Sequence, residues 1–439
     1  MKLATDAAPS FDVEAGDAWV STTIDKSARF LIWSVTAILF SLPVLIQERI
    51  VKDSRSVDFV YFYAASTILR DSSPENLYNP EIQEAACQKV LPIPNGEPTY
   101  GSSPYPPFVA LLFAPTARLP FWGAFRIHQA ISFALYLFGL VLLLRRFFPA
   151  QPILSNIFLP FALAYLPWIS NTWLNGQLSA LGFIALAVAL AEQKSGHLFR
   201  SGLALSVCLY KPTLLVLLIP MLLFRRQLRV LLGFAAGGCV LVGAATIAFG
   251  WHIWVAYARL VVSLGSLERL RQLPQYVDLI AFFSLLTGTR FAGVLALLST
   301  VIALAFLITA WRRDKDGPQL AWAGAITWTL ILSPYVPLYD TILIIPSMIA
   351  SAAAFRLGRT NALPGSLLLI FVGAWLSAAL ALLIHVQLLT VAIAVVGSLQ
   401  IAASLRSSHK ETPGHTHFPE VAVPAKPNSS CHAKWDQYP

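Results

Sequence analysis

Long apolar runs bounded by basic residues constrain this chain more than any other feature of its sequence. A bilayer has a hydrocarbon core about 30 Å thick, so a helix needs roughly 20 apolar residues to cross it. Runs of about this length or somewhat shorter recur along the 439 residues. They are Ala28–Ile46, Trp122–Leu144, Ile153–Ile169, Leu178–Ala191, Val230–Phe249, Phe291–Trp311, Leu320–Leu332, Leu338–Phe355, Leu363–Ile384 and Val386–Leu405. We therefore predict an all-α polytopic membrane protein.

The composition agrees with this fold class. The chain is 56% hydrophobic and 12% charged, whereas soluble domains are about 45–50% apolar and about 25% charged. A soluble enzyme, a disordered regulator and a disulfide scaffold are excluded, the last because the four cysteines are scattered. The net charge of +9 comes from basic residues at the ends of apolar runs, which is the positive-inside pattern. We expect contact with membrane lipids and none with nucleic acid.

A lysine and a proline interrupt one further apolar run, residues 199–224. A single crossing would place Lys211 near the bilayer centre, at a cost of several kcal/mol. Two half-spans meeting at Lys211 would place it in a polar cavity, with Pro212 starting the second helix. Only the second arrangement puts the basic clusters on the cytoplasmic side. We predict two half-spans and about 12 transmembrane helices, in a multi-pass protein of the inner (plasma) membrane.

This topology divides the chain into segments with different surroundings. Residues 1–27 form a cytoplasmic N-terminal segment, residues 28–405 the transmembrane domain, and residues 406–439 a disordered cytoplasmic tail. Residues 47–121 form a long first extracytoplasmic loop, and residues 250–290 a second extracytoplasmic segment. The first loop should carry a helix around Val57–Leu69 and a short interfacial helix at Phe108–Ala117.

The first loop contains one carboxylate in an unusual setting. Asp58 is the only charged residue between Arg55 and Arg70, and apolar and aromatic residues flank it. A carboxylate at an apolar boundary can act as general base toward a sugar hydroxyl. The alternative is an ordinary charge at a helix N-terminus, and spacing leaves both open. No later loop is as long, and this asymmetry favours an enzyme with an outward-facing site over a transporter built from two halves.

The run Asp58-Phe59-Val60-Tyr61-Phe62-Tyr63-Ala64-Ala65 resembles a segment of the GT-C glycosyltransferases. More narrowly, it is similar to glycosyltransferase family 87, the polyprenyl-phosphate-mannose-dependent mannosyltransferases. The resemblance covers roughly residues 30–350. It continues through Leu77-Tyr78-Asn79, Tyr105-Pro106-Pro107-Phe108, Ala114-Pro115, Leu119-Pro120, Asn175-Gly176-Gln177-Leu178-Ser179, Tyr210-Lys211-Pro212, Ser333-Pro334-Tyr335 and Tyr339.

The resemblance implies a GT-C-type bundle, a polyprenyl-phosphate sugar donor, and an acceptor hydroxyl on a lipid or glycan. It also implies a hexosyltransferase that inverts the anomeric carbon, with mannose as the default sugar and Asp58 as the base that takes the acceptor proton. The loop has no Asp-x-Asp motif, so we expect no metal and no cofactor. We further expect a monomer. The alternative function is a polytopic lipid or sugar transporter or flippase.

Three basic side chains are candidates for binding the donor phosphate, since cations stabilise a phosphate leaving group. They are Lys211, Arg126 and His128. Lys211 is alternatively a structurally paired lysine, and the other two are alternatively interface anchors.

Candidates for binding the sugar or the acceptor come from three segments. They are Tyr61, Tyr63, Asn175, Gln177, Tyr335, Tyr339 and Asp340. Asn175 and Gln177 stand at an outward helix end, where capping is an equally good explanation. The family more often has an aromatic residue or a histidine near Asp340, so this aspartate leaves open how the phosphate is held.

Overall fold

The computed structural model describes residues 26–54, 57–93, 100–149, 152–263, 273–313, 318–358 and 362–407. Residues 1–25 and 408–439, which hold nearly all of the predicted N-terminal segment and tail, lie outside this range. The described residues form helices and no strand; Tyr276 and Pro337 make one isolated bridge. The all-α prediction is confirmed.

The elements follow one another in two groups. Those up to the second long helix are α1 (Lys26–Ser54), α2 (Phe59–Asp71), η2 (Pro74–Tyr78), α3 (Pro80–Val90), α4 (Pro107–Phe113), η3 (Ala114–Arg118) and α5 (Phe121–Phe147). The remainder are α6 (Pro152–Leu163), η4 (Pro167–Leu174), α7 (Ser179–Lys194), α8 (Leu198–Ser206), η5 (Val207–Tyr210), η6 (Pro212–Leu215), α9 (Leu218–Phe224), α10 (Leu228–Phe249), α11 (His252–Ser263), η7 (Leu273–Gln275), α13 (Leu279–Thr287), α14 (Thr289–Arg313), α15 (Pro318–Leu332), η8 (Leu338–Leu343), α16 (Ile344–Gly358), α17 (Ala362–Leu383) and α18 (Leu388–Ser407).

Among the described residues, six helices are long and apolar enough to cross a membrane: α1, α5, α10, α14, α17 and α18. A seventh crossing results if α6 and η4, which are bent by 53° relative to each other, form one broken span. These helices fit a multi-pass membrane protein. The predicted count of about 12 is not confirmed, because apolar helices such as α7, with 16 residues, and α15, with 15, are shorter than a full crossing.

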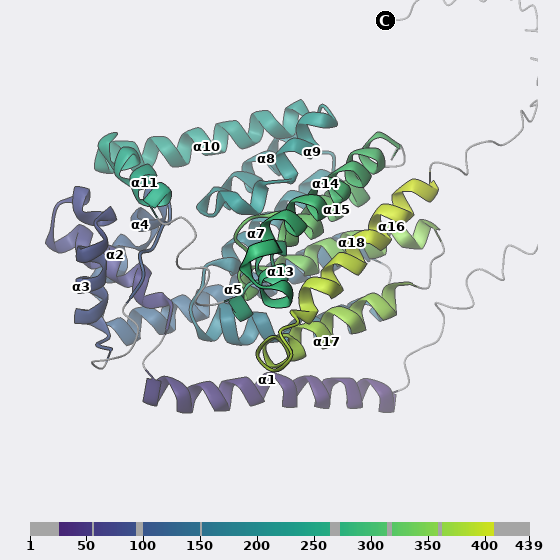
Figure 1. The fold of residues 1–439 in the computed structure, drawn as a ribbon, viewed down its shortest axis with the longest axis horizontal. Helices are drawn as coiled ribbons and strands as arrows, with labels where there is room; N and C mark the ends of the chain where they lie inside the picture. Colours follow the sequence, from purple (N-terminus) through teal and green to yellow (C-terminus); the bar gives the residue numbers. More distant parts are fainter. Residues whose placement is uncertain are drawn as a thin grey trace, which may run out of the picture.

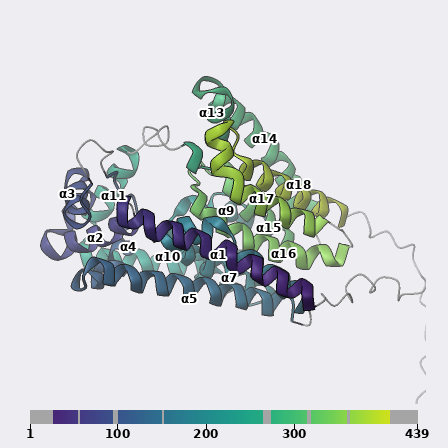
Figure 2. The same cartoon turned by 90° about the horizontal axis from the view of Figure 1, so that it is seen from below.

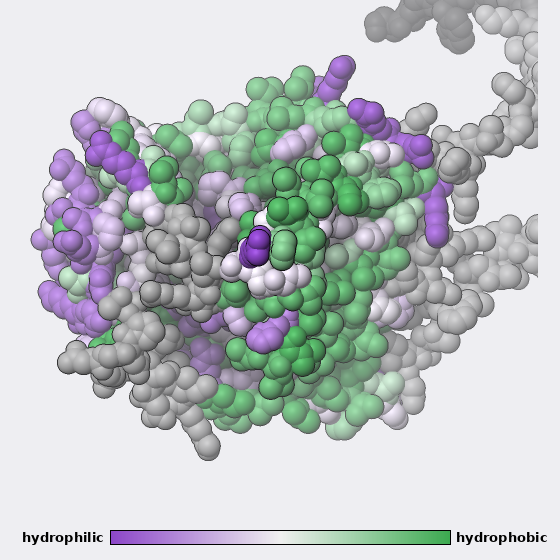
Figure 3. Space-filling view, in the orientation of Figure 1, coloured by the Kyte–Doolittle hydropathy of each residue, from purple (hydrophilic) through white to green (hydrophobic). Residues whose placement is uncertain are grey.

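The elements of the first predicted loop gather at one end of the helical bundle. Figure 1 shows α2, α3 and α4 together at the left, with α11 above them. The predicted helices at Val57–Leu69 and Phe108–Ala117 correspond to α2 and to α4 with η3. In the view from below, α1 runs lengthwise over the bundle (Figure 2), and it packs on α6 and η4. The ring of Phe40 in α1 lies 6.5 Å from that of Phe133 in α5. In Figure 3, hydrophilic side chains cover the loop end and hydrophobic ones most of the bundle.

Helix ends that carry basic residues meet at the other end of the bundle. Lys194, at the end of α7, lies over the Phe147 ring at the end of α5. Arg312, at the end of α14, lies over the Phe224 ring at the end of α9. Helix ends that the positive-inside pattern assigns to one face are thus in contact, α7 with α5 and α14 with α9.

The helix break at Lys211 is confirmed. η5 ends at Tyr210, Lys211 has non-helical backbone angles (φ −143°, ψ 84°), and η6 begins at Pro212. A Cβ on Gly202 of α8 would clash with the Val230 carbonyl in α10, and one on Gly237 would clash with Ser206. Later residues of α8 thus meet later residues of α10, so these helices run parallel. The chain that connects two parallel helices must run back to the side where the first helix began. This agrees with the predicted pair of half-spans on either side of Lys211.

Candidate active site

Asp58 is held by two side-chain amides from a distant part of the chain. Its Oδ2 accepts hydrogen bonds from Asn175 Nδ2 at 2.6 Å and from Gln177 Nε2 at 2.7 Å. Among the described residues, no donor hydrogen-bonds to Oδ1. One carboxylate oxygen is thereby fixed in place, and the other remains able to accept a proton.

The position of Asp58 is that of a helix N-cap, yet its side chain makes no capping hydrogen bond to α2. Capping does occur elsewhere in this chain: the side chain of Asp278 accepts from the Ala281 N–H at the start of α13. The Phe59 N–H instead bonds to the Asn175 carbonyl at 3.2 Å. The simple helix-charge explanation therefore does not account for the orientation of the Asp58 carboxylate.

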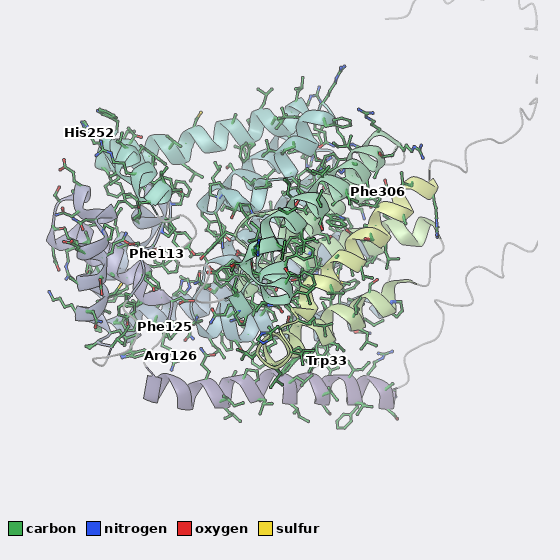
Figure 4. All side chains as sticks on the ribbon, in the orientation of Figure 1. Trp33, Phe113, Phe125, Arg126, His252 and Phe306 are labelled. Atoms are coloured by element: carbon green, nitrogen blue, oxygen red, sulfur yellow. The ribbon has the colours of Figure 1, made fainter. Side chains whose placement is uncertain are left out.

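A glycine permits this close approach of two segments. Gly176 has φ of +77°, a conformation that favours glycine. A Cβ there would lie 2.7 Å from Phe59 Cβ and 2.9 Å from Phe125 Cε2. The rings of Phe59 and Phe125 themselves lie 5.5 Å apart. Figure 4 labels Phe125 near the loop end of the bundle, between Phe113 and Arg126. The sequence Asn-Gly-Gln can present both amides to Asp58 because its middle residue has no side chain.

A second carboxylate, Asp340, pairs with Lys211 deep in the protein. The lysine ammonium contacts Asp340 Oδ2, and Ser179 Oγ donates to Asp340 Oδ1 at 2.8 Å. The side chain of Asp340 is 0% exposed and that of Lys211 is 9% exposed. The Lys211 ammonium also lies 4.8 Å from the Tyr335 ring centroid and 4.7 Å from that of Tyr339. If Lys211 is a structurally paired lysine, as the sequence left open, its partner is Asp340.

The segment Asn175–Ser179 connects the two carboxylates. Gln177 contacts Asp58, and Ser179, two residues later, contacts Asp340. Tyr105 adds a third link, because its hydroxyl donates to Gln177 Oε1 at 3.1 Å. Burial first, and then the charges of Asp340 and Asp58, raise the pKa of Tyr105, which places this phenol near both carboxylates. Tyr105 and Ser179 were not among the predicted site residues, although both stand in segments that carry the resemblance.

The two basic candidates on α5 do not share a site. Arg126 is exposed, and its Nη1 donates to Gln129 Oε1 at 3.0 Å. His128 is buried, its ring centroid is 5.0 Å from that of Phe59, and Ser132 Oγ lies 3.4 Å from its Nε2. Residues two apart on a helix point to nearly opposite sides. His128 therefore packs against Phe59 at the start of α2, while Arg126 lies on the surface.

The two tyrosines predicted from α2 also differ in their contacts. Tyr63 is buried, and its hydroxyl donates to the Leu119 carbonyl at 2.7 Å. It is a packing residue in this structure. Tyr61 is partly exposed and, together with Tyr105, lines a small pocket beside α2, α3 and α4.

The surroundings of Asp58 change its acidity. Burial raises the pKa of the Asp58 carboxyl from 3.8 to about 6, and the hydrogen bond from Gln177 offsets part of this rise. A carboxyl with such a pKa is ionised at neutral pH and still basic enough to take up a proton during a reaction. In the part of the chain that the structure describes, no three His, Cys, Asp or Glu side chains are grouped to hold a metal ion.

A multi-pass helical bundle, with a poised carboxylate beside polar amides at one end, has the features of a membrane-embedded enzyme. The family comparison makes this class specific. The model of glycosyltransferase family 87 matches residues 104–334, and the chain belongs to this family. No curated protein and no solved structure matches it. Family membership supports a membrane glycosyltransferase over the transporter alternative.

Proposed function

We propose that the protein transfers a hexose, mannose by family default, from a polyprenyl-phosphate donor to a hydroxyl group of a lipid or glycan. The reaction takes place at the extracytoplasmic face and inverts the anomeric carbon. The observation that carries this proposal is the Asp58 carboxylate, with Oδ2 held by Asn175 and Gln177 and Oδ1 left to accept a proton.

In the proposed reaction, Oδ1 of Asp58 takes the proton of the acceptor hydroxyl. The oxygen of that hydroxyl forms a bond to the anomeric carbon from the side opposite the phosphate. The bond between that carbon and the phosphate oxygen breaks, and polyprenyl phosphate leaves with its electron pair. Proton transfer and bond formation occur together, so the carboxylate needs a fixed position, which the two amides supply.

Lys211 is the proposed contact for the leaving phosphate. An ammonium has more N–H donors than one carboxylate oxygen uses, so Lys211 can stay paired with Asp340 and still donate to a phosphate oxygen. The Tyr335 and Tyr339 rings, which flank the ammonium, are proposed to contact the sugar together with Asn175 and Gln177. Arg126, on the surface of α5, is proposed to meet a lipid phosphate as the donor approaches.

A lipid and glycan profile of cells with and without the gene tests the activity. Cells that lack the gene should accumulate the unextended acceptor, and the wild-type gene should restore the extended product. A gene encoding Asp58→Asn should not restore it, whereas Asp71→Asn, an exposed acid on the same helix, should. Normal glycolipids in cells lacking the gene, with impaired uptake of a solute, would instead support transport.

A separate experiment tests the prediction that the loop elements face the extracytoplasmic side. A single cysteine introduced at Ser73, in the loop elements, should react with an impermeant thiol reagent added to intact spheroplasts. A cysteine at Arg229, at the basic end, should react only after permeabilisation. The reverse result would place the carboxylate on the cytoplasmic side.

A further inference from the structure

Both the side chain and the backbone of Tyr105 make hydrogen bonds at the site. Its hydroxyl donates to Gln177 Oε1 at 3.1 Å, and its own carbonyl accepts a 2.7 Å hydrogen bond from the Tyr78 hydroxyl. Its ring centroid lies 5.0 Å from that of Phe62. Tyr105 is therefore held by η2 and α2 while its hydroxyl contacts the amide that holds Asp58.

The amide of Gln177 has two orientations of nearly the same shape, and they differ chemically. In the orientation of the structure, Nε2 donates to Asp58 Oδ2 and Oε1 accepts from Tyr105. If the amide were turned over, Oε1 would face Oδ2. Two oxygens without a proton between them repel each other, so the turned amide is compatible only with a protonated Asp58.

The Tyr105 hydroxyl favours the first orientation for two reasons. It supplies Oε1 with a donor that the turned amide would not use. A hydrogen bond to Oε1 also polarises the amide and strengthens the bond that Nε2 donates to the carboxylate, because hydrogen bonds in a chain reinforce one another. The chain Tyr105–Gln177–Asp58 ends on a negative charge, so each of its bonds stabilises the ionised carboxylate.

We propose that Tyr105 is the positioning residue of the general base: it fixes the amide of Gln177 in the orientation that keeps Asp58 ionised. The proposal rests on the proposed function, in which an ionised Asp58 takes the acceptor proton. Tyr105 does not itself take that proton. It acts through Gln177, across 72 residues of sequence.

Four other titratable groups lie around Asp58, and one of them, Tyr339, also hydrogen-bonds to Tyr105. His128 faces the α2 start from α5, Tyr339 faces it from η8, and the Lys211–Asp340 pair lies beyond Ser179. None of them hydrogen-bonds to the Asp58 carboxylate. A change in the protonation of Asp58 in a Tyr105 variant is therefore attributable to the lost hydroxyl.

The first test is the pH dependence of transfer by Tyr105→Phe, measured as kcat/KM between about pH 5 and pH 9. The acid limb should move to higher pH, with a loss of about three- to tenfold at pH 6 and at most about twofold at pH 8.5. Tyr100→Phe is the matched control, because Tyr100 lies in the same loop and its hydroxyl donates to the Leu91 carbonyl and, among the described residues, makes no hydrogen bond to Gln177 or Asp58. That variant should keep the wild-type profile. An equal loss at every pH for Tyr105→Phe would overturn the proposal and assign Tyr105 a packing role.

The second test needs no substrate. The carboxyl stretching band of protonated Asp58 can be isolated as the infrared difference between the wild type and Asp58→Asn, and followed against pH. The midpoint should be higher in Tyr105→Phe than in the wild type, and coincident midpoints would overturn the inference. If cells lacking the gene show no change in glycolipids, the proposed function fails; if Asp58→Asn still transfers sugar, only the base role of Asp58 fails. The infrared midpoints test Tyr105 separately from both outcomes.

Discussion

Gln177 donates a 2.7 Å hydrogen bond to Asp58 across 119 residues of sequence. Asn175 donates to the same oxygen, and Gly176 between them lets the chain approach the start of α2. The carboxylate and its two amides therefore form one unit, although they come from different segments. Substitution of any of these three side chains should therefore change the reactivity of the carboxylate while the protein still folds.

Replacing Asp58 by asparagine should abolish sugar transfer while the protein still inserts into the membrane. The amide keeps the shape of the carboxylate but cannot take a proton, and general-base catalysis contributes about 10²–10⁴-fold. Asp58→Glu should recover little, because one more methylene displaces the carboxylate by about 1 Å. Turnover of the purified variants in lipid vesicles is the measurement, with Asp71→Asn as the control. If Asp58→Asn retained more than about a tenth of the wild-type rate, Asp58 would not be the base.

The rate of transfer should fall on the acidic side of about pH 6. Burial raises the pKa of Asp58 to about 6, and the base works only when ionised, so kcat/KM should drop about tenfold per pH unit below that value. The effect on stability has the opposite sign. Because the folded state raises this pKa above 3.8, ionisation of Asp58 costs stability as the pH rises through about 6. Asp58→Asn should therefore unfold at the same temperature as the wild type, or higher, at pH 8; a clearly lower unfolding temperature would contradict the buried setting.

Lys211→Met should destabilise the protein, because it leaves the Asp340 carboxylate buried without a cation. Breaking a buried pair typically costs about 3–5 kcal/mol. The double variant Lys211→Met with Asp340→Asn should recover much of the stability, since no charge is then left unpaired. Thermal unfolding in detergent measures this recovery.

Turnover of the same double variant separates the two roles of Lys211. If the ammonium also contacts the leaving phosphate, the double variant should be stable and still slow. A stable double variant with near-normal turnover would remove Lys211 from the phosphate site and leave it as a structural partner of Asp340.

Gly176→Ala and Gly196→Ala form a matched pair. Both glycines have positive φ, +77° and +79°, so both substitutions strain the backbone by about 1–2 kcal/mol. Only the Cβ at position 176 would also collide with Phe59 and Phe125, while position 196 has open space. Gly176→Ala should lose activity by more than its strain alone explains, and Gly196→Ala should stay active. Equal activity of the two variants would show that the approach of Asn175 to α2 is not needed.

Local sequence patterns were sufficient to predict several features of this structure. The lone charge in an aromatic run identified Asp58, and a lysine followed by proline inside an apolar run predicted the break at Lys211. The helix of α2 and the short helix predicted at Phe108–Ala117, which the structure begins at Pro107, also follow from local patterns of apolar residues and proline. Each of these signals lies within about a dozen residues of sequence.

Other features depend on contacts between distant segments. The pairing of Lys211 with Asp340 spans 129 residues, and nothing near either residue indicates the other. Tyr63 and Tyr105 stand in similar aromatic surroundings, yet one hydroxyl bonds to the Leu119 carbonyl and the other to Gln177. Which tyrosine hydroxyl reaches Gln177 is decided by tertiary packing, and no local pattern distinguishes Tyr105 from Tyr63 for this contact.

The parallel packing of α8 on α10 has a consequence for how the chain is inserted during synthesis. α8 and α9 have 9 and 7 residues, too few to cross a bilayer, whereas α10 has 22. Helix α8 packs against Gly233 and Gly237 of α10. These glycines leave the ribosome after α8. The half-helices around Lys211 should therefore wait near the translocon until α10 arrives, and residues 198–249 should enter the lipid as one unit. A chain truncated after Arg226 and released from the ribosome should remain sensitive to protease at Lys211, and one truncated after Phe249 and released should be resistant.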